Sequence, residues 1–280
     1  MEHMKKAAIL YDFDKTLCDR DMQEYSLIPK LGYKKPKDFW KEVGVLSEAN
    51  RMDGISAYLY MLKKKFEDSG SPLKRSDFEG LGSSINLYPG VEDWFSRINA
   101  FGKTLGLQVE HYIISSGMEE IIADTPIARE MKRIYACRYY YDADGIAQWP
   151  AQIVNYTTKT QYIFRINKQV LDESNDNDLN TWVPMGERPV PFKRMIYVAD
   201  GLTDVPCMKL VKENGGRSIV VYNNASAPAG FAALKLMNEN RADFIAPADY
   251  SEDSRMDEIV KSVLRLMSAE AAVEEFEGIR

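Results

Sequence analysis

The sequence has little of what several common classes of enzyme need. Its 280 residues include two histidines, His3 and His111, and three cysteines, Cys18, Cys137 and Cys207. So few histidines leave little material for a Ser-His-Asp or Cys-His mechanism. The cysteines are scattered without CxxC or Cys/His spacing, so neither a zinc site nor a disulfide framework is indicated.

Excess positive charge and long apolar runs are missing as well. The formal net charge of −6 gives no electrostatic case for nucleic acid or for an anionic membrane as a partner. No apolar run approaches the roughly 18 to 20 residues of a membrane span, and the start MEHMKKAAILYDFD lacks the features of a signal peptide. We therefore expect a cytoplasmic globular protein with a small-molecule partner; the oligomeric state is not indicated.

Short buried strands alternate with helices along most of the chain. Strands are predicted at 7–11, 109–116, 194–200, 218–223 and 242–247, and helices at 91–98, 118–134, 158–168, 205–213, 229–239 and near the end of the chain. CRYYYDADGIAQW predicts a hairpin that turns at Asp144-Gly145. This alternation predicts an α/β fold with a mostly parallel sheet covered on both sides, in which ligands bind beyond the C-terminal ends of the strands.

Two segments depart from this alternation. The region from about residue 18 to 88 has few strand signals, and its best-marked segment places five apolar residues on one helical face. These residues are Ile55, Tyr58, Leu59, Leu62 and Phe66. The region therefore predicts a helical insertion. The stretch 170–192 is long, polar and turn-rich, and a loop of that size is either functional or mobile.

Polar residues follow three of the predicted strands at the point where each strand ends. They are Asp12 and Asp14 after the first strand, Ser115-Ser116-Gly117 after the second, and Asp200 with Asp204 after the third. Convergent carboxylates repel one another unless a cation neutralises them, and hard carboxylate oxygens suit Mg²⁺, which binds phosphate as well. Lys159, which opens the helix after the hairpin, can supply a fixed positive charge to the same site.

This ordered set of motifs strongly resembles the haloacid dehalogenase (HAD) superfamily of phosphohydrolases. DFDKT matches the family's first motif, Ser115 in IISSG the second, Lys159 in TTKTQ the third and ADGLTD the fourth. Ala199 stands where the family usually has glycine, a small-for-small change. The resemblance covers residues 7–18 and about 88–250, and DFDKTLCDRDMQEYS is similar to the phosphoserine phosphatase-like branch.

The resemblance implies a Rossmann-like catalytic core formed by residues 1–18 and 88–280, and a small helical type-one cap domain at 19–87. It implies a phosphatase that hydrolyses a small phosphomonoester through an aspartyl-phosphate intermediate. Asp12 is then the nucleophile, and Asp14 is the general acid and later the base. The metal ligands are the Asp12 side chain, the Asp14 backbone carbonyl and the Asp200 side chain.

The remaining motif residues have supporting roles in this interpretation. Asp204 orients the metal shell and Lys159. Thr16 holds the loop of the first motif and is expected among the residues that bind phosphate or substrate. Ser115, with the backbone N–H groups of Ser116 and Gly117, grips the transferring phosphoryl oxygens. A structural alternative remains for the serines, which can cap the following helix, and Lys168 or Lys193 can compete with Lys159.

Asp21 lies nine residues after Asp12, where the phosphoserine phosphatase-like branch carries a substrate-binding glutamate. Its carboxylate can contact a substrate amine or hydroxyl, or it can cap the helix that starts near Met22. Lys34, Lys35, Lys37 and Arg51 can contact an anionic substrate, although such residues are more often solvated surface charges. Three other functions stay open: a phosphotransferase to an alcohol, a metal-free haloacid dehalogenase and a non-catalytic phosphate-binding module.

Overall fold

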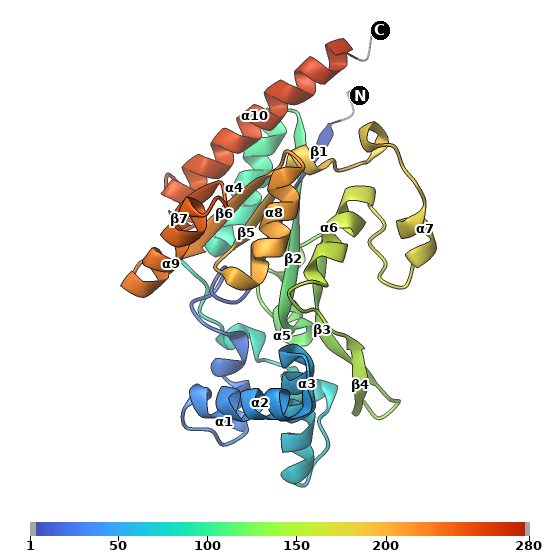
Figure 1. Cartoon of the computed structure of the whole chain (residues 1–280), viewed down its shortest axis with the longest axis vertical. Coiled ribbons are helices and arrows are strands. Elements are labelled where there is room, and N and C mark those ends of the chain that lie inside the picture. Colours follow the sequence, from blue (N-terminus) through green and yellow to red (C-terminus); the bar gives the residue numbers. More distant parts are fainter. Residues whose placement is uncertain (1–3, 278–280) are drawn as a thin grey trace.

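The computed structural model describes residues 4–277 and contains one seven-stranded sheet of order β4-β3-β2-β1-β5-β6-β7 (Figure 1). The strands are β1 Lys5–Tyr11, β2 Leu107–Met118, β3 Arg133–Tyr141, β4 Ala147–Gln152, β5 Met195–Ala199, β6 Arg217–Tyr222 and β7 Phe244–Pro247. All neighbouring strands are parallel except β3 and β4, which form an antiparallel hairpin. The predicted α/β class and mostly parallel sheet are therefore confirmed.

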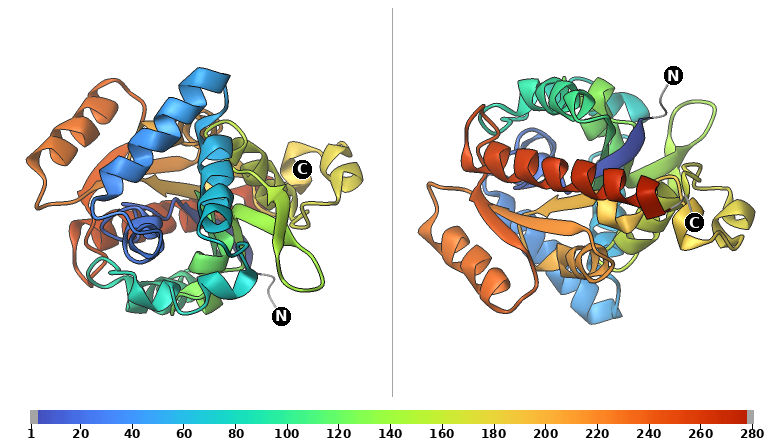
Figure 2. Two further views of the ribbon diagram at one scale, coloured as in Figure 1. Left: turned by 90° about the horizontal axis from the view of Figure 1, so that it is seen from below. Right: turned by 90° about the horizontal axis from the view of Figure 1, so that it is seen from above.

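Helices cover both faces of the sheet. They are α1 Leu27–Lys30, α2 Pro36–Asn50, α3 Gly54–Asp68, α4 Val91–Thr104, α5 Glu119–Ala123, α6 Lys159–Lys168, α7 Asp176–Asn180, α8 Val205–Glu213, α9 Ala227–Asn238 and α10 Arg255–Glu277. α4 and α10 pack on one face, and α6 and α8 pack on the other (Figures 1 and 2). The predicted last helix is α10, and one of its faces is buried through Met256, Ile259, Val260, Val263 and Met267. No helix within residues 4–277 combines the length and the apolar character that crossing a membrane requires.

The register of the three central strands brings their carboxyl ends to one level. Tyr11 of β1 pairs with Ile113 of β2 on one side and with Val198 of β5 on the other. Asp12 therefore follows this level by one residue, and Ser115 and Asp200 follow it by two. Because β1 is buried on both faces, its apolar residues specify a central strand, and the polar residues beyond it share one edge of the sheet.

A hydrogen-bonded chain of polar side chains lies under α4. The Trp94 indole N–H donates to the Tyr11 hydroxyl (2.8 Å), and that hydroxyl lies 3.1 Å from Nδ1 of His111. Nε2 of His111 lies 3.0 Å from Oδ1 of Asn99. Since the tyrosine already accepts from the indole, its own proton goes to Nδ1, and the neutral imidazole carries its proton on Nε2. The polar groups of Trp94, Tyr11 and His111 are thus all hydrogen-bonded.

The segment between β1 and α4 forms the helical insertion, built mainly by α2 and α3. It lies at the lower end of the molecule in Figure 1 and across the end of the sheet in the left view of Figure 2. The five residues predicted on one face of the second helix lie in α3, and four of them are buried, Ile55 being partly exposed. The aromatic rings of Phe39, Trp40 and Tyr58 pack together between α2 and α3.

Two connections join the insertion to the rest of the chain, and they are bonded to each other. Cys18 and Leu87 form an antiparallel bridge, and the Tyr88 N–H donates to the Leu17 carbonyl (3.0 Å). The insertion also contacts the β3–β4 hairpin. There the Ala147 N–H donates to the Leu73 carbonyl (2.8 Å), and the Arg75 N–H donates to the Gly145 carbonyl (2.9 Å).

The predicted hairpin is confirmed, with its turn between Tyr141 and Ala147. The Asp142 carboxylate accepts from the N–H groups of Asp144 (3.0 Å) and Ile146 (2.9 Å). Gly145 has φ of +73°, a left-handed conformation that glycine adopts without steric cost. The Asp-Gly signal in the sequence therefore marks the turn correctly.

The predicted helix at 118–134 is wrong. β2 continues to Met118, α5 has five residues, and β3 already begins at Arg133. Pro126 explains the early end, because proline lacks an N–H and disfavours a helical conformation at the residue before it. That residue, Thr125, turns its hydroxyl back to the Ile122 carbonyl (2.6 Å) and closes the last turn.

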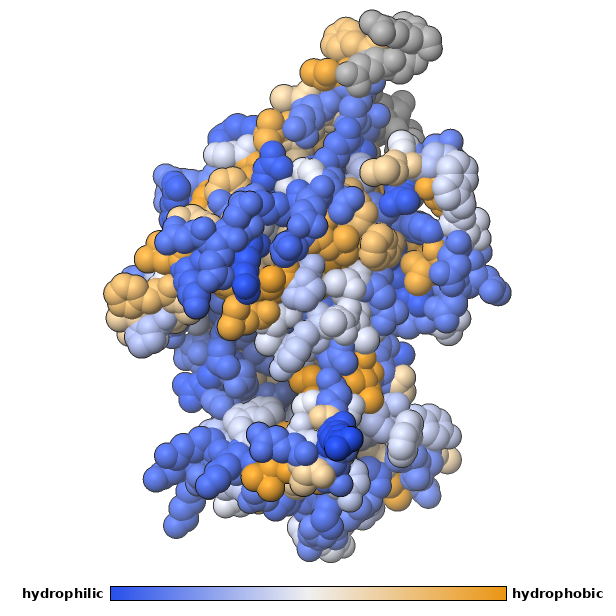
Figure 3. All heavy atoms as spheres, viewed as in Figure 1, coloured by the Kyte–Doolittle hydropathy of each residue, from blue (hydrophilic) through white to orange (hydrophobic). Residues whose placement is uncertain are grey.

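The long stretch 170–192 contains α7 and is held by one buried arginine. Nη1 of Arg165 donates to the Asp172 carbonyl (2.8 Å), and Nη2 donates to the Glu173 carbonyl (3.0 Å) and the Asp176 carboxylate (2.6 Å). In Figure 1 this stretch lies at the periphery, far from the insertion. The face of the molecule seen in Figure 3 is largely hydrophilic, with scattered apolar residues.

Candidate active site

Lys159 occupies the centre of a buried charge cluster at the carboxyl ends of β1 and β5. The residue is 1% exposed, and its Nζ lies 2.8 Å from Oδ1 of Asp12 and 2.7 Å from Oδ1 of Asp204. Burial alone lowers the pKa of Lys159, but the two carboxylates outweigh it and raise the pKa above its usual value. The ammonium group therefore stays charged and fixed between two strand ends.

Both carboxylate oxygens of Asp204 accept hydrogen bonds from neighbouring side chains. Oδ1 accepts from Lys159 and from the Tyr197 hydroxyl (2.6 Å), and Oδ2 accepts from the Thr203 hydroxyl (2.8 Å). The residue is completely buried. This geometry matches the role in which Asp204 orients Lys159. Tyr197, which also bonds to Asp204, was not predicted from the sequence.

The residues present fit a hard divalent cation. Carboxylate oxygens of Asp12, Asp200 and Asp204 lie within 4.8 Å of one another. Burial, followed by the charges of neighbouring aspartates, raises the pKa of Asp12 to about 7 even though Lys159 opposes this shift. The same two causes raise the pKa of Asp200 to about 6. Within residues 4–277 the Asp200 side chain has no hydrogen bond or ion pair, so its oxygens are available to a cation.

Asp14 has a different environment from Asp12. Its Oδ1 accepts from the backbone N–H of Met22 (2.8 Å). Burial and then the charges of Asp21 and Asp12 raise its pKa well above the usual value. A carboxyl group with a raised pKa keeps its proton to a higher pH than an ordinary aspartate does, which suits a general acid.

Asp21 faces the same site but does not cap a helix. Its side chain makes no capping hydrogen bond to the short 3₁₀ turn Met22–Glu24. Instead, Oδ1 of Asp21 lies 2.7 Å from Nζ of Lys15, which has a left-handed backbone with φ of +57°. The alternative in which Asp21 caps the following helix is therefore wrong, and the carboxylate is held beside Asp14 by a lysine that the sequence did not single out.

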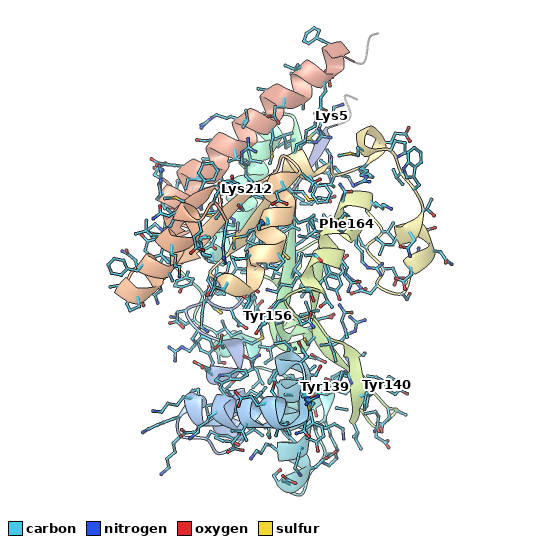
Figure 4. All side chains as sticks on the ribbon, in the orientation of Figure 1. Lys5, Tyr139, Tyr140, Tyr156, Phe164 and Lys212 are labelled. Atoms are coloured by element: carbon cyan, nitrogen blue, oxygen red, sulfur yellow. The ribbon has the colours of Figure 1, made fainter. Side chains whose placement is uncertain are left out.

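One cavity of about 440 Å³ joins these groups to the helical insertion. The core side is lined by Asp12, Asp14, Lys15, Asp21, Ser116, Tyr156, Lys159, Asp200, Gly201, Leu202 and Thr203. The insertion side is lined by Gln23, Trp40, Val43, Gly44, Ser47, Gly54, Ile55 and Tyr58. Tyr156, labelled in Figure 4, lies between the sheet and the insertion. The site is thus a polar, acidic floor under a mostly apolar roof.

Comparisons with known proteins agree with this architecture. No protein-family model matches the sequence. An uncharacterised protein of Borreliella burgdorferi is 26% identical over 284 residues, covering 89% of this chain and 93% of that protein. A phosphoserine phosphatase solved as a phospho-aspartyl intermediate analogue superposes with a TM-score of 0.55 at 15% identity, over 92% of this chain and 99% of that one.

Two further solved structures are similar. A probable phosphoserine phosphatase from Vibrio cholerae has a TM-score of 0.54 at 13% identity, over 96% of this chain and 67% of that one. A HAD family hydrolase from Salmonella enterica serovar Typhi has a TM-score of 0.52 at 14% identity. It matches 78% of this chain, which spans 63% of that hydrolase. The chain has the HAD hydrolase fold.

Ser115 and Ser116, near the carboxyl end of β2, have different surroundings within this HAD fold. Oγ of Ser115 is buried and accepts from the Gly117 N–H (3.0 Å). Ser116 lines the cavity, and its Oγ has no hydrogen-bond partner within residues 4–277. A Cβ at Gly117 would collide with the end of the Met22 side chain, so a larger residue there would require Met22 to move. Ser116 is thus the member of the pair that lines the cavity, whereas the motif match points to Ser115.

Thr16 holds the loop of the first motif through its backbone. Its N–H donates to the Phe13 carbonyl (3.2 Å), and its own carbonyl accepts from the Tyr250 hydroxyl (2.8 Å). The Thr16 hydroxyl is buried, has no partner within residues 4–277, and is not part of the cavity lining. The expected contact of Thr16 with phosphate or substrate therefore has no support in the geometry.

The cationic residues considered for the insertion do not reach the cavity. Lys34, Lys35, Lys37 and Arg51 are all exposed, and none lines it. Sequence reasoning also missed Gln23, which lies on the insertion side of the cavity. Its position two residues after Asp21 carried no signal, because one glutamine beside a predicted helix start has many ordinary roles.

Proposed function

We propose that the protein is a magnesium-dependent phosphatase that hydrolyses a small phosphomonoester through an aspartyl phosphate on Asp12. One observation carries the proposal: the buried Lys159 ammonium bridges Asp12 and Asp204 beside the unpaired carboxylate of Asp200. Phosphoryl transfer depends on positioned positive charge around an in-line nucleophile, and this cluster provides it at the floor of a metabolite-sized cavity.

In the first step, an oxygen of Asp12 attacks phosphorus and the bond between phosphorus and the alcohol oxygen breaks. Asp14 gives its proton to the departing oxygen, so the alcohol leaves neutral. The raised pKa of Asp14 supports this role, since it favours the protonated form that the step requires. Lys159 holds the attacking carboxylate in one orientation.

In the second step, a water oxygen attacks the phosphorus of the aspartyl phosphate. Asp14, now a carboxylate, accepts a proton from that water, and the bond between phosphorus and the Asp12 oxygen breaks. Phosphate and the free Asp12 carboxylate result, and Asp14 is again protonated. Splitting one displacement into two lets the same pair of aspartates serve both halves of the reaction.

The Asp12 and Asp200 side chains and the Asp14 backbone carbonyl would hold Mg²⁺, with Asp204 acting through Lys159. When bound, the cation supplies neutralisation of the charge on the phosphoryl oxygens. Ser116 and the N–H groups that follow Ser115 would bind those oxygens. A metal-free dehalogenase has no use for Asp14 or Asp200, whereas a phosphotransferase would use the same residues and differ only in the acceptor.

Release of inorganic phosphate from a panel of phosphomonoesters, with and without Mg²⁺, tests the proposal. Asp12→Asn is isosteric but cannot attack, so it should abolish release while the melting temperature stays close to that of the wild type. Adding an excess of a simple alcohol separates hydrolysis from transfer, because a phosphotransferase would form the new ester. Substantial activity in Asp12→Asn would remove the nucleophile from the scheme. Location in the cytoplasm stays a prediction.

A further inference from the structure

The roof of the cavity contains a buried polar pair with unused hydrogen-bonding capacity. Gln23 is 2% exposed, and its Nε2 donates to the Tyr58 hydroxyl (3.2 Å). Oε1 of Gln23 is buried and has no hydrogen-bond partner within residues 4–277. Both residues line the cavity. Leaving such an oxygen unpaired costs free energy, so a bound molecule that donates a hydrogen bond to it would be stabilised.

The pair presents one donor and one acceptor whichever way the amide is oriented. With Nε2 donating to the tyrosine, Oε1 is a free acceptor and the tyrosine proton a free donor. With the amide reversed, Oε1 accepts from the tyrosine, which leaves the amide N–H₂ as the donor and the tyrosine oxygen as the acceptor. A hydroxyl group, which both donates and accepts, satisfies the pair in either state. A carboxylate accepts only, and an ammonium group donates only.

Among residues 4–277, the cavity lining offers this pair no free positive charge. The cavity lining contains two cations, Lys15 and Lys159, and both are paired with aspartates on the floor. The roof residues other than the pair are Trp40, Val43, Gly44, Ser47, Gly54 and Ile55, none of which is charged. A second anionic group on a substrate would therefore lose its water without gaining a counter-charge, and it would also meet the carboxylates of the floor.

We infer, on the basis of the proposed phosphatase function, that the Gln23–Tyr58 pair selects a phosphomonoester whose alcohol part carries a further hydroxyl and no second anionic group. The phosphate lies on the acidic floor, the carbon skeleton contacts the apolar roof, and the hydroxyl bonds to the pair. This assignment places hydroxyalkyl phosphates ahead of phosphorylated amino acids.

Four substrates of the wild-type enzyme test this selection without any mutation. They are glycerol 1-phosphate, propyl phosphate, O-phosphoserine and p-nitrophenyl phosphate. Propyl phosphate has the same three-carbon chain without hydroxyls, and O-phosphoserine has the carboxylate and ammonium groups. The kcat/KM for glycerol 1-phosphate should exceed those for propyl phosphate and O-phosphoserine by roughly tenfold or more, as expected when a buried pair is left unsatisfied.

Two conservative variants assign that preference to the pair. Gln23→Leu and Tyr58→Phe keep most of the packing and remove the polar atoms. In each, the ratio of kcat/KM for glycerol 1-phosphate to that for propyl phosphate should fall to within about threefold of unity. Gln161→Leu, on the exposed side of α6, makes the same chemical change outside the cavity and should keep the wild-type ratio.

The outcomes are distinguishable. A preference for O-phosphoserine in the wild type, or an unchanged ratio in both folded variants, overturns the selection by Gln23 and Tyr58 while leaving the phosphatase intact. No phosphate release from any of the four esters, p-nitrophenyl phosphate included, contradicts the phosphatase proposal itself and the selection with it. Thermal melting of each variant checks that it folds.

Discussion

Nζ of Lys159 lies 2.8 Å from Oδ1 of Asp12, although 147 residues separate them in the chain. The contact joins the first residue of α6 to the first residue after β1. It is buried, and the lysine also bonds to Asp204. The pair therefore ties the proposed nucleophile to the strand end that carries the rest of the acidic cluster.

Replacing Lys159 should damage both stability and catalysis. Lys159→Met leaves Asp12 and Asp204 buried without a counter-charge, and removing one partner of a buried ion pair typically costs about 3–5 kcal/mol. We expect kcat/KM to fall by roughly 10²-fold or more, as for other fixed charges near a transition state. Urea denaturation and steady-state kinetics measure the two effects.

Lys193→Met is the matched control, because Lys193 is exposed and paired with Glu274 far from the cavity. Surface pairs of this kind contribute about 1 kcal/mol or less. Lys168 is also excluded as a substitute for Lys159, since its Nζ bonds to the carbonyls of Leu179 and Thr181. Wild-type activity in folded Lys159→Met would show that the bridge has no catalytic role.

Removal of the metal by a chelator should abolish the phosphatase activity. EDTA is expected to abolish phosphate release, and Mg²⁺ should restore it, whereas Ca²⁺ should fail because its longer, more numerous bonds disturb the in-line geometry. Asp200→Asn should raise the Mg²⁺ concentration that gives half-maximal activity, since it weakens one ligand and keeps the shape. Turnover that survives exhaustive chelation would return the metal-free dehalogenase to consideration.

His111 should make folding weaken in acid. Burial lowers the pKa of His111 from 6.5 to about 3. Between these values the unfolded chain binds a proton at this residue and the folded chain does not, so the free energy of unfolding falls as the pH falls below 6.5. The contribution is about 1.4 kcal/mol per pH unit, or roughly 2 kcal/mol between pH 6.5 and 5.

The difference between wild type and His111→Gln isolates this term from the carboxylates that titrate in the same range. Glutamine stays neutral, so the variant should lose less stability than the wild type between pH 6.5 and 5 in urea titrations. Parallel pH profiles for the two proteins would mean that His111 can take up a proton in the folded state.

Asp21→Ala tests whether this carboxylate contacts the substrate. Because the structure shows no helix cap at Asp21, the variant should melt within a few degrees of the wild type. If Asp21 binds a substrate hydroxyl or amine, kcat/KM for the best substrate should fall much further than for p-nitrophenyl phosphate, which offers no such group. Equal losses on both substrates would confine Asp21 to holding Lys15 and shaping the charge around Asp14.

The sequence predicted those parts of the site that lie at the ends of strong local patterns. A buried apolar run followed at once by Asp12, and another followed by Asp200, fix which residues emerge at one edge of a parallel sheet. Lys159 was found because a hairpin signal and a helix start bracket it. The sequence signals that predicted Asp12, Asp200 and Lys159 each lie within a few neighbouring residues.

The missed features depend on contacts between distant segments. Gln23 and Tyr58 are 35 residues apart, and no local pattern shows that their side chains meet above the cavity. The error in the helix predicted at 118–134 is instead local. The apolar residues of this segment suit a helix, but Pro126 ends it early. Which serine faces the cavity depends on the direction in which β2 continues past Ser115, and this direction comes from packing against Met22.

The paired connections at Cys18 and Leu87 act mechanically as a single hinge. Because the two chains are bonded side by side there, any rotation of the insertion relative to the core bends both of them together. On the far side, such a rotation has to break the two backbone hydrogen bonds between the hairpin and residues 73–75, at about 1–3 kcal/mol in total. A substrate that reached the cavity only after such a rotation would bind with an apparent affinity lowered by that free-energy cost.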